Sequence, residues 1–243
     1  MRVFSMGAKI CGGRVILRVQ ALAWEVFMSV LHERRSFFSI LASLAGAVAI
    51  HESAEGAPVQ APGAPAGNWD LTWLDALKGQ HKQVYDLGSH ELALDPNPLR
   101  FARNFLDTFR DVYRLEFPAI NTAIGISGPA FPMNASDRLW VKYRLGERSK
   151  IVDPMTKQPA VRNIFIDGGD TSIKAMQARG TVLWQCNVAL GNVARQLAQA
   201  TQMPFEEVRA DLIAGLNPGV RLVPSHVMAL ALTQERGFTY MKP

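Results

Sequence analysis

The sequence predicts an α/β protein with a flavodoxin-like, mostly parallel sheet and helices on both of its faces. Three observations carry this prediction. The chain has 243 residues, of which 48% are hydrophobic and 19% charged, a length and composition that suit one globular domain with extensions. Short apolar runs alternate with amphipathic helical runs in the second half. An apolar run also ends on Cys186 and is followed at once by a helical pattern, as at a strand–helix junction of such a sheet.

The N-terminal segment predicts an export signal. Arg34 and Arg35 precede Phe37 and an uncharged run that continues to Ile50, which is too short to span a bilayer comfortably but suits a signal-peptide core. The pattern resembles a twin-arginine signal. An amphipathic N-terminal helix and an uncleaved anchor are the alternatives. We expect an extension before the true start over 1–27, the signal peptide over 28–57, a flexible linker over 58–68 and the α/β domain over 69–243.

The body of the chain shows helical and strand periodicity in turn. Pro98 opens a long amphipathic helix with Phe101, Phe105, Phe109 and Val112 on one stripe. The predicted strands are 82–87, 121–128, 181–185, 219–223 and 238–241. The predicted helices are 69–77, 99–115, 134–146, 172–179, 187–202, 205–214 and 225–236.

The region between the second and third predicted strands has the character of an insertion. Asn134 is expected to cap a helix that stops at Gly146. Residues 147–170 hold prolines, glycines and mixed charge. They predict a long loop that packs over the site or against another subunit.

Cys186 is the candidate catalytic residue. A helix N-terminus offers backbone N–H groups and a positive dipole end, and both favour a thiolate over a thiol. One such sulfur can carry a second sulfur atom as a persulfide. The alternative is a buried structural cysteine, because free cysteine is among the most buried residue types.

Other polar residues are expected at the same carboxyl edge of the sheet. His90 and His226 follow predicted strands and could hydrogen-bond the thiolate or a ligand, although each could equally be a solvated loop histidine. Asn187 and Ser225 are further candidates for ligand binding and, alternatively, simple helix caps. Asp86 and Ser127 share the location, whereas His81 is expected at the opposite edge.

Composition argues against several classes of function. The net charge is +5, but residues 58–243 contain no cluster of lysines and arginines, so a nucleic-acid partner is not expected. The cysteines are Cys11 and Cys186, on opposite sides of the predicted signal, so a disulfide framework is not expected. With no CxxC pair and no zinc-type spacing, we expect neither a metal nor a cofactor.

The second half of the chain resembles the DsrE/DsrF-like (YchN-like) family of sulfur-relay proteins. The motifs that carry the resemblance are Leu183–Asn187, Val223–Val227 and Leu232–Tyr240, with His226 where the family often has glycine and Phe238 where it has tyrosine. Segments Lys78–Asp86 and Trp140–Gly146 resemble exported, uncharacterised members. The resemblance implies a flavodoxin-like domain that forms homo-trimers or homo-hexamers. It also implies a persulfide-carrying cysteine at the position of Cys186.

Three functional hypotheses follow from the sequence. In the first, an exported DsrE-like protein binds or transfers sulfane sulfur through Cys186, with the twin-arginine translocase and a sulfur donor or acceptor protein as partners. In the second, the chain is a non-catalytic ligand-binding or assembly module with a structural cysteine, so whether it is an enzyme stays open. In the third, His90, His226 and Cys186 build a metal or cofactor site.

Overall fold

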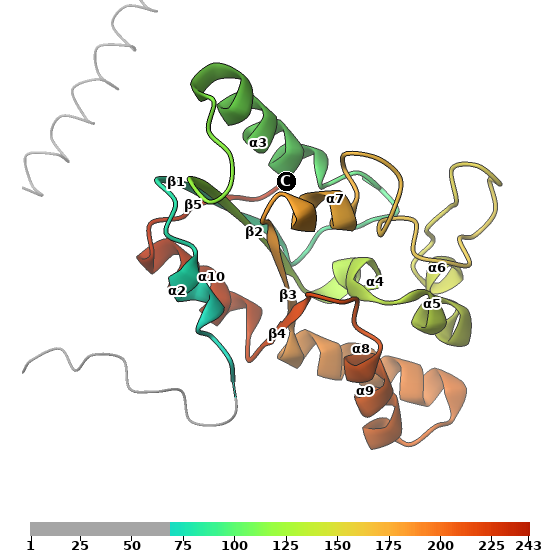
Figure 1. The fold of residues 1–243 in the computed structure, drawn as a ribbon. Helices are drawn as coiled ribbons and strands as arrows, with labels where there is room; N and C mark the ends of the chain where they lie inside the picture. Colours follow the sequence, from blue (N-terminus) through green and yellow to red (C-terminus); the bar gives the residue numbers. More distant parts are fainter. Residues whose placement is uncertain (1–68) are drawn as a thin grey trace, which may run out of the picture. The chain divides into compact units, whose positions relative to one another are not determined.

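The computed structural model describes residues 69–243 (Figure 1). The predicted upstream extension, signal peptide and linker lie outside these residues. Among the helices of this part, none is both long and apolar enough to cross a bilayer.

The structure contains a five-stranded sheet in which every neighbouring pair is parallel, in the order β4-β3-β2-β1-β5. The predicted α/β, flavodoxin-like fold is therefore confirmed. The strands are β1 (His81–Leu87), β2 (Ile120–Ile126), β3 (Val182–Cys186), β4 (Arg221–Val223) and β5 (Thr239–Met241).

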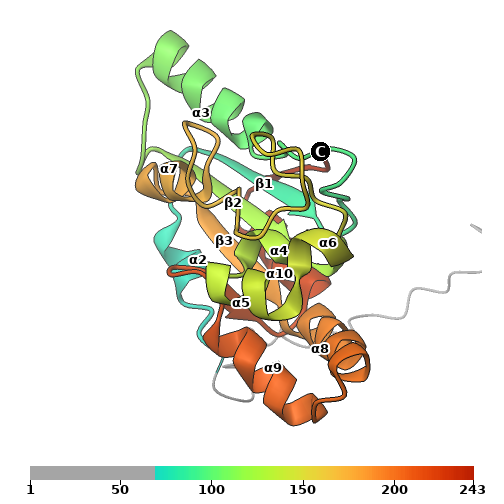
Figure 2. The same cartoon turned by 90° about the vertical axis from the view of Figure 1, so that its right-hand side faces the viewer.

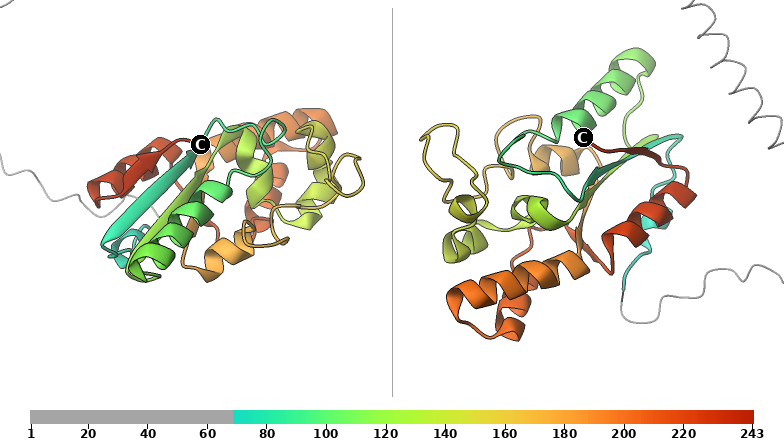
Figure 3. Two further views of the ribbon diagram at one scale, coloured as in Figure 1. Left: turned by 90° about the horizontal axis from the view of Figure 1, so that it is seen from above. Right: turned by 180° about the vertical axis from the view of Figure 1, so that it is seen from behind.

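The strand order explains which helices cover which face. Strands β1 to β4 are successive neighbours, so right-handed crossovers place the helices between them on one face of the sheet. The chain then runs back from β4 to β5, which places the last helix on the opposite face (Figure 1, and Figure 3, right). The helices are α2 (Trp73–Ala76), α3 (Arg100–Tyr113), η1 (Gly128–Ala130), α4 (Phe131–Asn134), α5 (Asp137–Tyr143), α6 (Leu145–Arg148), α7 (Ile173–Ala178), α8 (Asn187–Thr201), α9 (Phe205–Ala214) and α10 (His226–Glu235).

Alternation along the strands divides the interior into two cores. Tyr85 of β1, Ile124 of β2 and Leu183 of β3 face the larger core, beneath α3 to α9. Their strand neighbours Val84 and Trp184 face the smaller core, beneath α2 and α10. Because β2 is buried on both faces, its sequence from Ala123 to Ile126 is continuously apolar rather than alternating. Figure 2 and Figure 3 (left) show the helices of the larger core and the sheet from two further sides.

The predicted helix over 134–146 is corrected. Asn134 is fully buried and its Nδ2 donates to the backbone carbonyl of Trp184, 3.1 Å away, so it does not cap a helix. The N-cap is Ser136, and α5 ends before Arg144, which takes a left-handed conformation. Gly146 lies inside the following short helix, α6, and does not stop the helix.

Two further expectations need correction. On α3 the most buried side chains are Ala102 and Leu106, while Phe101, Phe105 and Phe109 pack on the core at half-burial. Val112 is exposed, because the last turn of α3 extends beyond the sheet. The predicted loop over 147–170 does not line the pocket at Cys186, described below, whereas its packing against another subunit stays a prediction.

The contact between α5 and α9 centres on one carboxylate. Asp211 of α9 is only 15% exposed and accepts from Tyr143 Oη (2.7 Å) and Lys142 Nζ (2.9 Å) and also from Arg138. Burial by itself would raise the pKa of Asp211, but these hydrogen bonds outweigh it and lower the pKa to about 2.

We expect this carboxylate to make stability pH-dependent. Since the folded-state pKa lies below the unfolded value, the stabilisation is complete above about pH 4 and is lost as the pH falls towards 2. Asp211→Asn should lower the free energy of unfolding by about 1–2 kcal/mol at pH 7 and by less at pH 3. Denaturant unfolding at several pH values measures this. Glu235→Gln, at an exposed position, is the control, and an equal loss for Asp211→Asn at pH 7 and pH 3 would contradict the account.

Candidate functional site

The candidate site lies where the chain leaves the sheet in opposite directions. After β3 the chain enters α8 on the side of the larger core, and after β4 it enters α10 on the side of the smaller core. Adjacent parallel strands whose connections diverge in this way leave a crevice at their carboxyl ends, the usual ligand position in open α/β sheets. Cys186 ends β3 and His226 begins α10, so both residues border this crevice.

Cys186 is held by backbone groups from both sides of the crevice. It is the N-cap of α8, and its Sγ accepts from the backbone N–H of Ala189 at 3.4 Å. The same Sγ accepts from the backbone N–H of His226 at 3.3 Å. The residue is only 4% exposed. Two N–H donors and a helix N-terminus stabilise negative charge on this sulfur.

The ring of His226 is engaged at both nitrogens. Trp184 Nε1 donates to His226 Nδ1 at 3.2 Å, and His226 Nε2 lies 2.7 Å from Asp86 Oδ1. Because the indole N–H can only donate, Nδ1 must be the acceptor, and the ring proton therefore sits on Nε2, facing the carboxylate. This pattern selects one neutral tautomer. It also leaves neither ring nitrogen free to take a proton from Cys186.

Asp86 anchors this group to β1 and β5. Its Oδ2 accepts from Tyr240 Oη of β5 at 2.7 Å, and its Oδ1 also accepts from the backbone N–H of Gly88 at 2.7 Å. Burial would raise the pKa of Asp86, but the hydrogen bonds from Tyr240, Gly88 and His226 lower it below its usual value. The hydrogen bond to Asp86 in turn raises the pKa of Tyr240 to about 12. The carboxylate is thus kept ionised and the phenol protonated at neutral pH.

Two glycines make room for the histidine ring. A Cβ on Gly125 of β2 would lie 2.4 Å from Trp184 Cζ2 and 2.7 Å from His226 Cε1. A Cβ on Gly88 would lie 2.7 Å from His226 Nε2. Side chains at either position would therefore displace the ring from its two partners.

A pocket of about 490 Å³ opens over Cys186. Its polar lining comes from the ends of several strands, and two exposed valines, Val188 and Val227, lie in its lining. Neither Ser127 nor Ser225 has a side-chain hydrogen-bond partner within residues 69–243, so both hydroxyls are available to a ligand. Residues lining the pocket include Asp86, Ser89, Ser127, Cys186, Ser225 and His226.

The structure brings only some of the predicted site residues together. His226 contacts Cys186 through its backbone N–H and not through its ring. His90 is turned towards its own loop, with Nε2 2.9 Å from the carbonyl of Asp95, and does not line this pocket. Asn187 Oδ1 accepts from Arg209 of α9 at 2.8 Å and is not the cap of α8. Ser225 is the N-cap of α10 by position, but its side chain makes no capping hydrogen bond.

The hypothesis of a metal or cofactor site built from His90, His226 and Cys186 therefore fails, because His90 lies elsewhere. More broadly, no group of three or more His, Cys, Asp or Glu side chains in 69–243 is arranged to hold a metal ion. The pocket does contain a cysteine, a histidine and an aspartate. They are not connected as a catalytic triad, since the ring of His226 bonds Trp184 rather than Cys186.

Sequence reasoning missed Trp184, Tyr240 and Gly125. Trp184 and Cys186 share one face of β3, since they are two residues apart. Asp86 and Gly125 are register partners of β1 and β2. Two-residue alternation would have placed Trp184 beside the site, but Tyr240 could be found only from the position of β5 next to β1.

Comparisons with known proteins add no functional assignment. No family model matches the chain, and no curated protein matches it. Among solved structures, the chain is similar to a protein of unknown function, MTH1491 from Methanobacterium thermoautotrophicum. The identity is 14%, the TM-score is 0.35, and the alignment covers 67% of this chain and 99% of that one.

We expect Gly125→Ala to disrupt the site from beneath. The added methyl group overlaps Trp184 and His226, so the free energy of unfolding should fall by about 1–3 kcal/mol. Denaturant unfolding followed by far-UV circular dichroism measures this stability. Gly191→Ala, in α8, is the matched control, because its Cβ meets nothing within 4 Å. Equal stability of the two variants would show that Gly125 does not hold the ring in place.

Proposed function

We propose that this protein carries sulfane sulfur as a persulfide on Cys186. The observation that supports the proposal most is the position of the sulfur. Its Sγ receives two backbone N–H groups at 3.3 and 3.4 Å and lines a pocket at the point where the chain diverges from the sheet.

The proposed step needs no oxidant. The thiolate of Cys186 attacks the outer sulfur of a donor R–S–SH, a bond forms between the two sulfurs, and the donor's S–S bond breaks. The electron pair of that bond leaves with R–S⁻, and Cys186 is left as Cys–S–SH. The proton on the outer sulfur is then free to pass to solvent or to the leaving thiolate. The reverse attack by an acceptor thiolate returns the sulfur and regenerates Cys186.

The surrounding residues would hold the sulfur rather than shuttle protons. His226 acts as a positioning residue, because its backbone N–H contacts Sγ while its ring is bound to Asp86 and Trp184. The hydroxyls of Ser127 and Ser225 line the same pocket and can donate to the outer sulfur of a persulfide.

The amino-acid sequence also supports proposals about where the protein is located and which partners it has. The resemblance to the DsrE/DsrF-like family supports a persulfide role, a homo-trimer or homo-hexamer, and a sulfur donor or acceptor protein. Arg34, Arg35 and Phe37 support export through the twin-arginine translocase, although they lie outside the described residues. Since relay partners in that family are cytoplasmic, an exported member would need a different partner.

A second candidate is a ligand-binding or assembly module in which Cys186 is structural. The specific observation in its favour is that Cys186 is 4% exposed and its Sγ already caps α8. A buried cysteine that only completes a helix N-terminus would show the same contacts. The two candidates differ in whether the sulfur reacts.

Sulfur uptake by the full chain tests the proposal. With Cys11→Ser as background, Cys186 is the one remaining thiol. Treatment with inorganic polysulfide should add one sulfur atom to the intact mass, and dithiothreitol should release it as sulfide. Cys186→Ser, which retains a hydroxyl in the capping position, should gain none.

The contrary result would be a chain that gains no sulfur while its native thiol also resists iodoacetamide. Alkylation of the same protein after unfolding would then show that the thiol is present but inaccessible. That outcome would favour the structural cysteine of the second candidate.

A further inference from the structure

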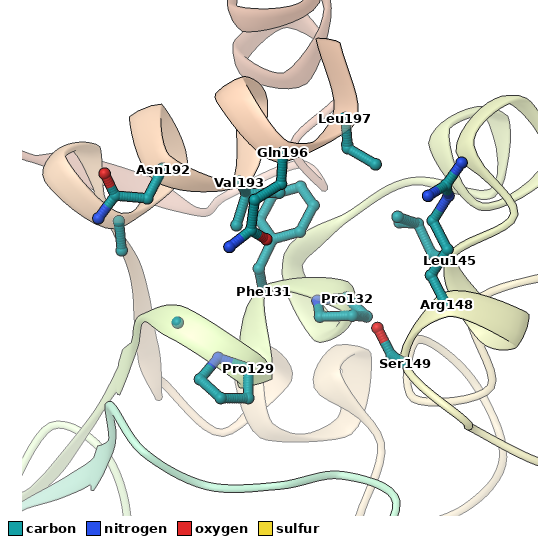
Figure 4. Close-up of a pocket in the computed structure, with 12 residues that line it drawn as sticks. Pro129, Phe131, Pro132, Leu145, Arg148, Ser149, Asn192, Val193, Gln196 and Leu197 are labelled. Atoms are coloured by element: carbon teal, nitrogen blue, oxygen red, sulfur yellow. The ribbon is translucent and has the colours of Figure 1, made fainter. Parts of the chain in front are cut away.

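A second, larger pocket lies next to the first. It has a volume of about 710 Å³, within the range typical of small-molecule sites. Helix α8 forms one wall with Asn192, Val193, Gln196 and Leu197, and the segment that follows β2 forms the opposite wall (Figure 4). Arg148 and Ser149, from the end of α6, close it at the end away from Asn192 (Figure 4).

The two pockets are neighbours along α8. Ala189 and Asn192 line both of them, and Ala189 also donates its backbone N–H to Cys186 Sγ. Residues 189, 192, 193 and 196 fall on one face of the helix, because they follow its three- and four-residue spacing. From Ala189 to Gln196 this face runs for about 10 Å. A ligand lying along this face through both pockets would have one end at Cys186 and the other towards Arg148.

The larger pocket combines apolar walls with an amide that has no partner among the described residues. Pro129, Phe131, Pro132 and Leu145 supply apolar walls. The Gln196 amide has no hydrogen-bond partner within 69–243 and points into the space between the walls (Figure 4).

Arg148 is the charged group at the far end. Its Nε donates to the carbonyl of Tyr143 at 2.9 Å, which fixes the direction of the guanidinium. It forms no ion pair with a carboxylate of the described part of the chain, whereas most arginines of this domain do. An arginine with free N–H groups at the end of an apolar pocket favours a carboxylate ligand.

We infer that this second pocket binds the organic body of the sulfur donor, a short peptide persulfide that ends in a carboxylate. The carboxylate pairs with Arg148, amide groups meet Gln196, and the persulfide reaches Cys186 past Asn192. The inference rests on the proposed function, because it names the donor class for the same cysteine. The transfer is the step given above, with the peptide thiolate as the leaving group.

The test compares two donors on the full chain in the Cys11→Ser background. Glutathione persulfide carries a peptide body with carboxylates, and inorganic polysulfide has none. The rate of sulfur gain at Cys186 is followed by intact mass. Arg148→Gln should slow loading from glutathione persulfide about fivefold, the loss expected for one exposed charge-assisted hydrogen bond, and leave loading from polysulfide unchanged. Arg162→Gln, at an exposed arginine that lines neither pocket, should change neither rate.

A binding measurement tests the pocket independently of any reaction at Cys186. The unreactive analogue S-methylglutathione should bind saturably in calorimetry, more weakly to Arg148→Gln, and equally to the parent and to Cys186→Ser. The assignment of the pocket would be overturned if S-methylglutathione showed no saturable binding, or if Arg148→Gln slowed loading from the two donors equally. In that case, loading of Cys186 from polysulfide would still support the persulfide function. If neither donor loads Cys186, the proposed function fails and the inference fails with it.

Discussion

The imidazole of His226 joins every strand of the sheet at its carboxyl edge. One ring nitrogen is bound by Asp86 of β1, which also accepts from Tyr240 of β5, and the other by Trp184 of β3. Gly125 of β2 leaves the space that the ring occupies, and β4 leads directly into the helix that carries it. We expect a change at any of these contacts to move the first turn of α10. The position of Cys186 depends on this turn, because the backbone N–H of His226 contacts its sulfur.

This arrangement separates two roles that a catalytic triad combines. The ring of His226 is held by hydrogen bonds within the fold, and only its backbone N–H contacts the sulfur of Cys186. Negative charge on Cys186 is therefore stabilised by fixed N–H groups and not by a proton acceptor. Such a site suits a reaction in which sulfur moves between thiolates, since that exchange needs an accessible, stabilised thiolate more than a general base. Under the proposed function, the neighbouring pocket along α8 would determine which donors can approach.

The sequence predicted the elements of the second half well, because each has its own local signal. Gly180 and Gly215 flank periodic segments, and the junction at Cys186 follows from an apolar run that meets a helical one. The site was predictable only in part. His90 and His226 both follow strands in the sequence. Only the structure shows that the ring of His90 contacts the backbone carbonyl of Asp95 in its own loop and is therefore turned away from Cys186. Tyr240 lies 154 residues from Asp86, and their contact depends on the return of β5 to the side of β1, which no local pattern encodes.

The tautomer of His226 tests the central claim most directly. Nitrogen-15 NMR of histidine-labelled protein at neutral pH distinguishes protonated from bare imidazole nitrogens, and His226→Gln identifies the signal. The structure predicts a proton on Nε2 and none on Nδ1, because Nδ1 accepts from Trp184 and Nε2 faces Asp86. A proton on Nδ1, in the other neutral form or in the imidazolium, would contradict the account. In either form the indole N–H of Trp184 could not donate to Nδ1, and the ring would not be held by the two partners that the account requires.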